Sequence, residues 1–332
     1  MSAPSDGPHR KLPRWIVLGA SGFVGSAIVA ELLRRGEHVM AMAAPRLSSD
    51  ASNAAALVAE AAHSPAVDSL AEAFSGAEFV INAAGLATPA EGSSPAMMGA
   101  NGLLPAVITL AARQAGVRRF VHLSSASVQG HRRMIDESGQ RAPFSAYSRT
   151  KALGEEVLEL LATAEVGSTG GLAPGNVVSI RATSVQGPCR PTTRSLVKVA
   201  SSALASVAAP GTAPTPVSSI DALAWFVVQS ALFTGPVPPL VLQPWEGLSV
   251  SEVLRAAGGR APVRLPKWFC HGVLSAGYFI SRMLGERLHG PIRRVELMWF
   301  GQGQEPGWAE SAGLIPTPAI AHVLEQARLS LR

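Results

Sequence analysis

Three evenly spaced glycines near the N-terminus, Gly19, Gly22 and Gly25, constrain the fold of this chain more than any other feature. The apolar run 15–18 before them suits a buried parallel strand, and the segment 26–35 after them has helical spacing. In such a place the first glycine permits a tight turn, the second lets the backbone approach a pyrophosphate, and the third lets helix and strand pack closely. The spacing therefore predicts a dinucleotide-binding turn at a helix N-terminus.

Strand-like and helix-like segments continue to alternate along the chain. Expected strands cover 15–18, 38–42, 78–81, 119–123, 177–181 and 240–242, and expected helices cover 26–35, 54–62, 69–74, 105–115, 146–162 and 220–232. This alternation predicts an α/β fold with a Rossmann-type, doubly wound parallel sheet. We expect a flexible tail over 1–13, a dinucleotide-binding domain over 14–188 plus about 214–245, and a smaller, mostly helical substrate lobe over about 189–213 plus 246–332.

Composition excludes several classes of protein. Hydrophobic residues make up 47% of the 332 residues and charged residues 15%, which favours a large core over disorder. The net charge is +5, but the arginine pairs are scattered rather than gathered into a stripe, so we expect no nucleic-acid binding and some attraction for an anionic small molecule. Two distant cysteines and eight histidines without a His-x-x-x-His pair predict no metal site.

Three segments lie outside the alternating pattern, and we make a separate prediction for each. Residues 1–13 are polar and lack the apolar core of a signal peptide, so we expect a cytoplasmic protein. The Ala/Ser/Pro-rich stretch 201–216 predicts a mobile segment. The longest apolar run, 268–284, is interrupted by polar residues and falls short of a membrane span. We expect a buried or pocket-lining helix there, with a membrane-surface helix as the alternative.

Tyr147 and Lys151 form a candidate proton-transfer pair. They lie four residues apart in an expected helix, so their side chains share a face. A free tyrosine has a pKa near ~10, and a neighbouring lysine cation stabilises the phenolate and lowers that pKa. Tyr147 is therefore expected to give a proton to a carbonyl oxygen or to take one from an alcohol.

The ordered set of motifs resembles the extended short-chain dehydrogenase/reductases of the NAD-dependent epimerase/dehydratase family. The matching pieces are residues 19–25, 82–85, 101, 124–130, 136–137, 147–155 and 181–188, spread over roughly residues 15 to 250. The resemblance implies a nicotinamide cofactor that supplies the hydride, while the protein supplies orientation and proton handling. It also suggests a homodimer formed through a helix pair that includes the Tyr147 helix.

The resemblance assigns roles to individual residues. Tyr147 would be the proton donor, Lys151 would also hold the nicotinamide ribose, Ser125 would be the catalytic hydroxyl with Ser124 as its substitute, and Asn101 would support a proton relay. Expected cofactor contacts are Gly19, Ser21, Gly22, Phe23, Val24, Gly25, Arg46, Ala83, Ala84, Gly85, Tyr147 and Lys151. Expected substrate contacts are Thr88, Ser124, Ser125 and Gln129.

The end of the second strand bears on the choice of cofactor. When the cofactor is NAD, this place usually carries an acid for the ribose 2′-hydroxyl, but here no acid appears until Asp50. Arg46 can pair with a 2′-phosphate through its planar fork. NADP(H) is therefore favoured, with NAD(H) as the alternative. If Arg46 binds no ligand, it is a solvated loop residue. By the same resemblance, His63-Ser64 stand about where the family has the acid that contacts adenine.

Departures from the family pattern narrow the reaction. Ala126-Ser127 stand where the sugar dehydratases of the family have Asp-Glu, so dehydration is disfavoured. The epimerase-reductases of the family have a cysteine at the position of Ala126, so the chain resembles them less. The first hypothesis is reduction of a nucleotide-linked keto sugar, with Arg190, Arg194 and Lys198 as candidate phosphate partners. The second is reduction of a hydrophobic cyclic ketone, polyketide or steroid-like, which the apolar run 268–284 supports.

Two further hypotheses complete the set. A nucleotide-sugar 4-epimerase with tightly bound NAD keeps the same residues and changes only the fate of the hydride. A non-catalytic NADP-binding regulator is the alternative of a different class. The intact set of Ser125, Tyr147 and Lys151 argues against such a regulator.

Overall fold

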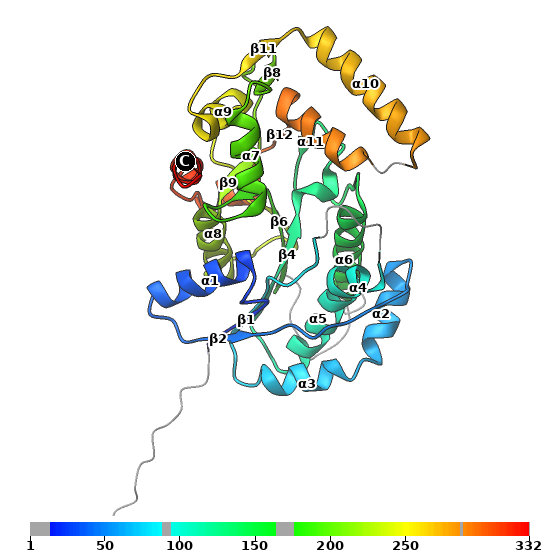
Figure 1. Ribbon diagram of the computed structural model, residues 1–332. Helices are drawn as coiled ribbons and strands as arrows, with labels where there is room; N and C mark the ends of the chain where they lie inside the picture. Colours follow the sequence, from blue (N-terminus) through cyan, green and yellow to red (C-terminus); the bar gives the residue numbers. More distant parts are fainter. Residues whose placement is uncertain (1–13, 88–93, 164–175, 286–287, 332) are drawn as a thin grey trace, which may run out of the picture.

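Six parallel strands form the central sheet of the computed structural model, which describes residues 14–87, 94–163, 176–285 and 288–331 (Figure 1). The strand order is β10-β6-β4-β3-β1-β2. The strands are β1 Trp15–Leu18, β2 Val39–Met42, β3 Phe79–Asn82, β4 Arg119–Ser125, β6 Val177–Ala182 and β10 Leu240–Leu242. The predicted doubly wound α/β fold is confirmed, and the expected strands agree with the observed ones to within about two residues.

Helices cover both faces of this sheet. Consecutive strand residues point to opposite faces, so Trp15 and Val17 contribute to one core, while Ile16 and Leu18 contribute to the other. Helices α1 Phe23–Arg34 and α8 Ile220–Leu232 pack on the first face. The other face is covered by α2 Ala54–Ala62, α3 Ala66–Ala73, α5 Leu104–Gln114 and α6 Ala146–Thr163. The sheet is therefore buried on both sides, as its continuous apolar runs predict.

Short elements connect or extend this core. They are α4 Pro95–Met98, the π-helix η1 Gly99–Leu103, the 3₁₀-helix η2 Ala126–Gln129, and the strands β5 Met134–Ile135, β7 Ser184–Gln186 and β9 Val217–Ser219. Among the described residues, only Pro95–Gln114 is long and apolar enough to span a membrane, and 72% of its most apolar window is buried in this fold. That burial is the behaviour of a core helix.

A second group of elements lies beyond the ends of β4 and β6 (Figure 1). Helices α7 Pro191–Ser201, α9 Val250–Gly258 and α13 Ile320–Leu329 share one small core. Next to it lie β8 Ser206–Ala208, β11 Val263–Leu265, α10 Lys267–Met283, α11 His289–Phe300 and β12 Gly303–Gln304. Helix α12 Trp308–Ser311 instead packs on the sheet face that α1 and α8 cover. Strand β12 pairs with β5, which joins this group to the loop that follows the end of β4.

Two expectations about this region are wrong. The stretch 201–216 is ordered rather than mobile, because Val207 and Ala208 are buried and β8 pairs with β11. The run 268–284 forms a helix, but the helix is not buried. Only Cys270, Leu274 and Ser281 are buried in α10, since that helix packs against its neighbours along one side alone.

Candidate active site

The glycine turn has the close contacts that its spacing predicts. Gly19 has a φ of +75°, and a Cβ there would lie 2.7 Å from the backbone nitrogen of Ala84. A Cβ on Gly25 would overlap the carbonyl oxygen of Gly19, which accepts a hydrogen bond of 2.9 Å from the Gly22 nitrogen. Larger residues at 19 and 25 would therefore push the turn away from β3 and from α1.

Helix α1 begins with open backbone donors. Its N-cap is Gly22, no side chain caps the first turn, and the first turn carries no acid. The orphan N–H groups and the positive end of the helix dipole favour an anion at this place. Ser21 is exposed, and Phe23 and Val24 are half-buried, so the turn is open to solvent. These features fit the pyrophosphate of a dinucleotide.

Asn82 shapes the neighbouring segment that carries Ala83, Ala84 and Gly85. Its side-chain oxygen accepts from the Ala84 nitrogen at 3.0 Å, and its amide nitrogen lies 3.1 Å from Nδ1 of His122. Both side chains are fully buried, and burial holds the pKa of His122 well below its ordinary value. Asn82 was expected only as part of a motif, and the structure gives it this supporting role.

Asn101 fixes the loop after β3 against α6. Its Nδ2 donates to the Leu86 carbonyl at 2.8 Å and to Thr150 Oγ1 at 3.0 Å, and its Oδ1 accepts from the Leu86 nitrogen at 3.1 Å. A Cβ on Gly85 would lie 2.9 Å from this Oδ1 and 3.2 Å from Nζ of Lys151. The side chain of Asn101 is thus fully engaged, and its relay role stays a prediction.

The structure brings Ser125, Tyr147 and Lys151 together from the end of β4 and the start of α6. The Ser125 hydroxyl lies near enough to the Tyr147 hydroxyl to lower the pKa of Tyr147, and the Oγ of Ser125 lies 2.9 Å from that of Ser127. Lys151 is buried and donates from Nζ to the Leu123 carbonyl at 2.8 Å. A phenol, a hydroxyl and an ammonium therefore meet beside the segment of Gly85.

The electrostatics of this set differ from the sequence expectation. Burial raises the pKa of Tyr147, against the smaller lowering effects of the Ser125 hydroxyl and the Arg190 charge. Lys151 was expected to lower that pKa, but the nearby cation that acts on Tyr147 here is Arg190. Burial also lowers the pKa of Lys151 itself to about 8, with Glu155 opposing. Desolvation is stronger than charge pairing at both groups.

Ser124 and Ser125, adjacent at the end of β4, point into different environments. Ser124 is buried and donates to Oε1 of Glu155 at 2.6 Å. Glu155 and Arg181 are fully buried and form a two-pronged ion pair with distances of 3.0 and 2.7 Å. Ser124 therefore belongs to a buried ionic network, which corrects its expected place among the substrate contacts. Only Ser125 faces Tyr147.

The side chain of Gln129 is also used in hydrogen bonds that hold the fold together. It is fully buried, its Nε2 donates to Asp136 Oδ1 at 2.7 Å and to the Gln140 carbonyl at 2.9 Å, and its Oε1 accepts from the Asp136 nitrogen. These bonds hold the loop that follows β5, so Gln129 is not a substrate contact as expected. Thr88, the remaining expected substrate contact, lies outside the described residues.

Arg190 is a site residue that sequence analysis placed only among candidate phosphate partners. Its guanidinium lies 4.9 Å from the centroid of the Phe23 ring, donates to the Val185 carbonyl, and acts on the charge of Tyr147. Its position two residues after the 181–188 motif was the available signal. Arg194 and Lys198 are exposed, and Lys198 lines a separate groove with Arg328.

Arg46 lies after the end of β2 and is exposed. Within the described part of the chain it makes no ion pair. The segment after it is held in place, because a Cβ on Gly99 would overlap the Leu47 carbonyl oxygen. Arg46 is therefore available to an anionic group at this edge of the sheet.

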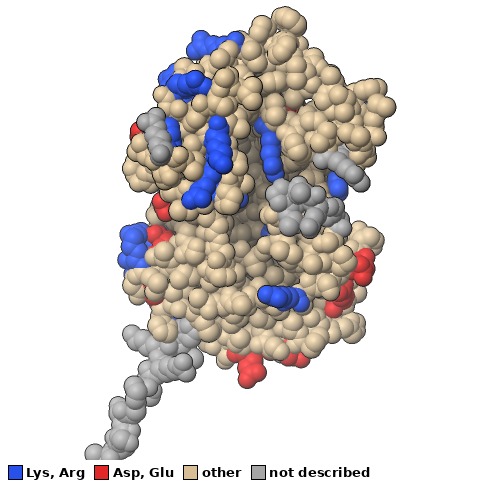
Figure 2. Space-filling model, viewed as in Figure 1, with Lys and Arg blue, Asp and Glu red and all other residues tan. Residues whose placement is uncertain are grey.

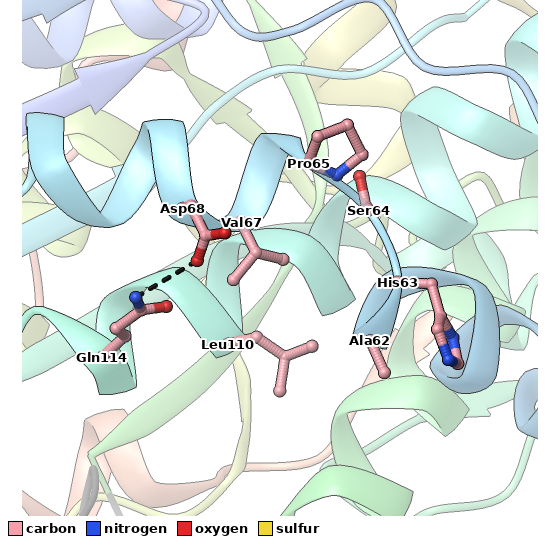
Figure 3. A pocket seen from close by; sticks show the side chains of 8 residues that line it. All are labelled: Ala62, His63, Ser64, Pro65, Val67, Asp68, Leu110 and Gln114. Atoms are coloured by element: carbon pink, nitrogen blue, oxygen red, sulfur yellow. Dashed lines mark hydrogen bonds between the residues drawn. The ribbon is translucent and has the colours of Figure 1, made fainter.

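A hollow of about 460 Å³ lies away from these residues, between α2, α3 and α5 (Figure 3). It is lined by Ala62, His63, Ser64, Pro65, Val67, Asp68, Leu110 and Gln114. Asp68 accepts a hydrogen bond of 3.2 Å from Gln114 across it. None of the residues of the Tyr147 site lines it, so we assign it no part in the chemistry.

Replacing Lys151 by Met should stabilise the protein at neutral pH. Below pH 8 both states hold the lysine proton, and the folded state carries the cost of the buried charge. Between pH 8 and 10.5 only the unfolded chain stays protonated, so stability rises with pH and the cost disappears. The lowered pKa of Lys151 corresponds to a destabilisation of the folded state by about 3 kcal/mol, which the substitution removes. Loss of the hydrogen bond to Leu123 reduces this gain by about 1 kcal/mol.

Chemical denaturation at pH 7 and at pH 10 checks this expectation. Lys151→Met should unfold with a larger free energy than the unaltered protein at pH 7, and the difference should shrink or reverse at pH 10. An equal difference at both values would mean that the buried charge is not its cause.

Comparison with known proteins places the chain among related enzymes. The model of the NAD dependent epimerase/dehydratase family matches residues 15–222. Sterol demethylase protein B of Methylococcus capsulatus is 33% identical over 147 residues, which are 42% of this chain and 44% of that protein. The 4-hydroxy-2-methyl-3-oxo-4-farnesyl-3,4-dihydroquinoline-1-oxide ketoreductase of Stigmatella aurantiaca is 29% identical over 153 residues, 44% of this chain and 45% of the ketoreductase.

Each of these two matches spans less than half of the relative's length. Among solved structures, the UDP-glucuronic acid 4-epimerase of Bacillus cereus in complex with NAD superposes with a TM-score of 0.61 at 16% identity, covering 94% of each chain. That likeness shows the fold over nearly the whole chain, including the elements beyond β4 and β6.

Proposed function

The chain belongs to the NAD-dependent epimerase/dehydratase family, and on that premise we propose that it interconverts a ketone and an alcohol on a hydrophobic cyclic substrate. It is an NAD(P)-dependent enzyme, as the family and its relatives indicate. The observation that carries the proposed chemistry is the closeness of the Ser125 and Tyr147 hydroxyls, with Lys151 buried next to Gly85.

The residues present fit a nicotinamide dinucleotide. The glycine turn 19–25 and the open N-terminus of α1 would hold the pyrophosphate, while Ala83 to Gly85 and Lys151 would line the nicotinamide end. When bound, the dinucleotide supplies or accepts the hydride. A Cβ at position 19 would collide with the backbone of Ala84. The two segments can lie this close together only because both carry small residues there.

Tyr147 handles the proton of the reaction. In the reducing direction its hydroxyl gives a proton to the carbonyl oxygen as the carbonyl carbon takes up a hydride, and the product is an alcohol. Ser125, whose hydroxyl lies near the phenol, would donate to the same carbonyl oxygen and hold it in line. The raised pKa of Tyr147 keeps the phenol protonated before reaction, as a general acid requires.

Arg190 supplies the positive charge that a phenolate at Tyr147 needs. Arg190 lies close enough to lower the pKa of Tyr147. The pKa of Lys151, about 8, allows that group to exchange a proton near neutral pH, unlike an ordinary lysine. Arg190 would stabilise the phenolate left after proton transfer.

The distribution of cations supports a hydrophobic substrate over a nucleotide-linked one. Of the three expected phosphate partners, only Arg190 lies at the Tyr147 site, while Arg194 is exposed and Lys198 lines another groove. The two curated relatives bear names that refer to a sterol and to a farnesylated quinoline, both hydrophobic ring compounds. The hydrophobic cyclic ketone therefore becomes the preferred hypothesis.

A nucleotide-linked keto sugar is the second candidate. Arg190 favours it, because a guanidinium beside the reacting phenol can pair with a phosphate or carboxylate. Part of that guanidinium is already engaged by the Val185 carbonyl and the Phe23 ring, however. A 4-epimerase with bound NAD would use the same residues and show no net consumption of cofactor.

We propose NADP(H) as the preferred cofactor. Arg46 is exposed after β2, and the nearest acid along that segment, Asp50, lies four residues further on. One charge-assisted hydrogen bond to the 2′-phosphate is worth roughly 1.5–3 kcal/mol. We therefore expect kcat/KM for NADPH to exceed that for NADH by at least about tenfold.

A substrate screen tests the proposed function. The full chain is incubated with NADPH or NADH and with steroid-like ketones, polycyclic ketones or nucleotide-linked keto sugars, and consumption of the reduced cofactor is recorded. Turnover of the ring ketones with NADPH supports the proposal. Turnover of keto sugars alone would favour the second candidate, and equal use of NADH would remove the role assigned to Arg46.

A further inference from the structure

Helix α10, Lys267–Met283, presents large apolar side chains to solvent along its whole length. Trp268 is 76% exposed, Phe279 64% and Met283 75%. Its buried residues, Cys270, Leu274 and Ser281, lie on the opposite side, where Tyr278 donates to Glu296 of α11 at 2.6 Å. The packing of α10 on α11 therefore leaves a second apolar face without a partner among the described residues.

The exposed apolar residues form one continuous stripe. At about 100° per residue, nine positions fall within an arc of roughly 160°, and each is exposed. They are Trp268, Phe269, Gly272, Val273, Ala276, Phe279, Ile280, Met283 and Leu284. The stripe contains no polar side chain and extends for about 25 Å, the length of a helix of this size. A surface helix normally turns its polar side outward, so this arrangement calls for an apolar environment.

The charged residues of the segment that contains the stripe, 253–285, are all positive. From residue 253 to residue 285 the chain has no Asp or Glu. Arg260, Arg264, Lys267 and Arg282 are exposed, and within the described residues none of them forms an ion pair. In the space-filling view, most of the surface over α10 carries no charged residue, and Lys and Arg lie to its side over the β11 end (Figure 2).

These features favour a lipid surface over a second copy of the chain. A two-fold contact through the same stripe would place the basic residues of both copies against each other. An anionic bilayer instead complements them, at about 1 kcal/mol for each cation near the surface. An apolar face with flanking Lys and Arg and with aromatic residues at its edge is the pattern of a helix lying in the membrane interface.

We propose that α10 binds in the plane of an anionic membrane surface, with its exposed apolar stripe in the acyl region and Arg264, Lys267 and Arg282 at the headgroups. Helix α11 connects this membrane-binding helix to the active-site region. There Arg293 donates to the Gly130 carbonyl at 2.7 Å, in the loop that follows Ser125. The proposal concerns a binding surface and stands independently of the proposed substrate.

Vesicle sedimentation tests this proposal with the purified full chain. Vesicles of phosphatidylcholine alone are compared with vesicles that contain about one third phosphatidylglycerol, since cationic residues bind only the second kind by charge. The triple variant Phe269→Ser, Phe279→Ser and Met283→Ser should bind the anionic vesicles at least tenfold more weakly. The matched control, Leu33→Ser with Leu204→Ser, alters equally exposed apolar residues on α1 and before β8 and should bind unchanged.

The outcomes separate the alternatives. Binding to anionic vesicles that the triple variant loses supports the proposal, provided that circular dichroism and dinucleotide binding show a folded protein. Absence of binding by the unaltered chain, equal binding to both kinds of vesicle, or equal loss in the control variant would overturn it. A stable dimer in solution that the triple variant converts to a monomer would assign the stripe to a second copy instead.

Discussion

Replacing Tyr147 by Phe should lower kcat for ketone reduction by about 10²- to 10⁴-fold, the range of a lost general acid. The phenyl ring keeps the packing of the first turn of α6, while the proton donor beside Ser125 disappears. Cofactor binding should change little, because the glycine turn and the Ala83–Gly85 segment are untouched. Stopped-flow measurement of NADPH oxidation gives kcat, and quenching of protein fluorescence gives cofactor affinity.

The chain offers a matched control for this substitution, since it has only two tyrosines. Tyr278 lies on α10, and its hydroxyl donates to Glu296. Tyr278→Phe removes the same atom from the other end of the molecule and should leave kcat unchanged. If Tyr147→Phe retained more than about a tenth of the activity, proton transfer from Tyr147 would not contribute to the slow step.

Replacing Arg181 by Met should destabilise the fold by about 3–5 kcal/mol, because the buried carboxylate of Glu155 loses its two-pronged partner and keeps only the more distant Arg141, at 3.4 Å. Arg181 is fully buried, holds Glu155 through two nitrogens, and donates from its third to the carbonyls of Asp136 and Ser138 at 2.9 and 2.7 Å. Glu155 is fully buried, so bulk solvent does not reach the remaining charge. Urea unfolding at pH 7 measures the loss.

A double variant separates the buried charge from the lost contacts. Arg181→Met combined with Glu155→Leu removes both charges, and replacing a buried pair by apolar groups is often neutral. The double variant should recover at least about half of the stability lost in the single variant. If both variants were equally unstable, the hydrogen bonds to Asp136 and Ser138 would dominate, rather than the charge of Glu155.

Much of the fold could be predicted from the sequence because its signals are local. The strand 15–18 and the helices 54–62 and 220–232 have the predicted bounds, since apolar periodicity and glycine or proline stops act within a few residues. The glycine turn is equally local, because steric limits at Gly19 and Gly25 depend on the turn itself and on the neighbouring strand.

The environments of individual side chains could not be predicted in the same way. Ser124 and Ser125 are identical neighbours in the sequence, and only the alternation of β4 directs one to Glu155 and the other to Tyr147. The sequence predicted Gln129 as a substrate contact, but its side chain is enclosed by Asp136 and Gln140. Arg190 acquires its importance from Phe23 and Tyr147, which are more than forty residues away in the chain.

Local sequence signals are enough to specify the doubly wound sheet, the dinucleotide turn and the placement of Tyr147 and Lys151 on one helix. Which groups are desolvated depends on how the whole chain packs. Burial sets the direction of the pKa shifts of Tyr147 and Lys151, and none of the described elements covers the apolar side of α10. Periodicity and turn signals arise from adjacent residues, whereas solvation depends on everything that packs around a side chain.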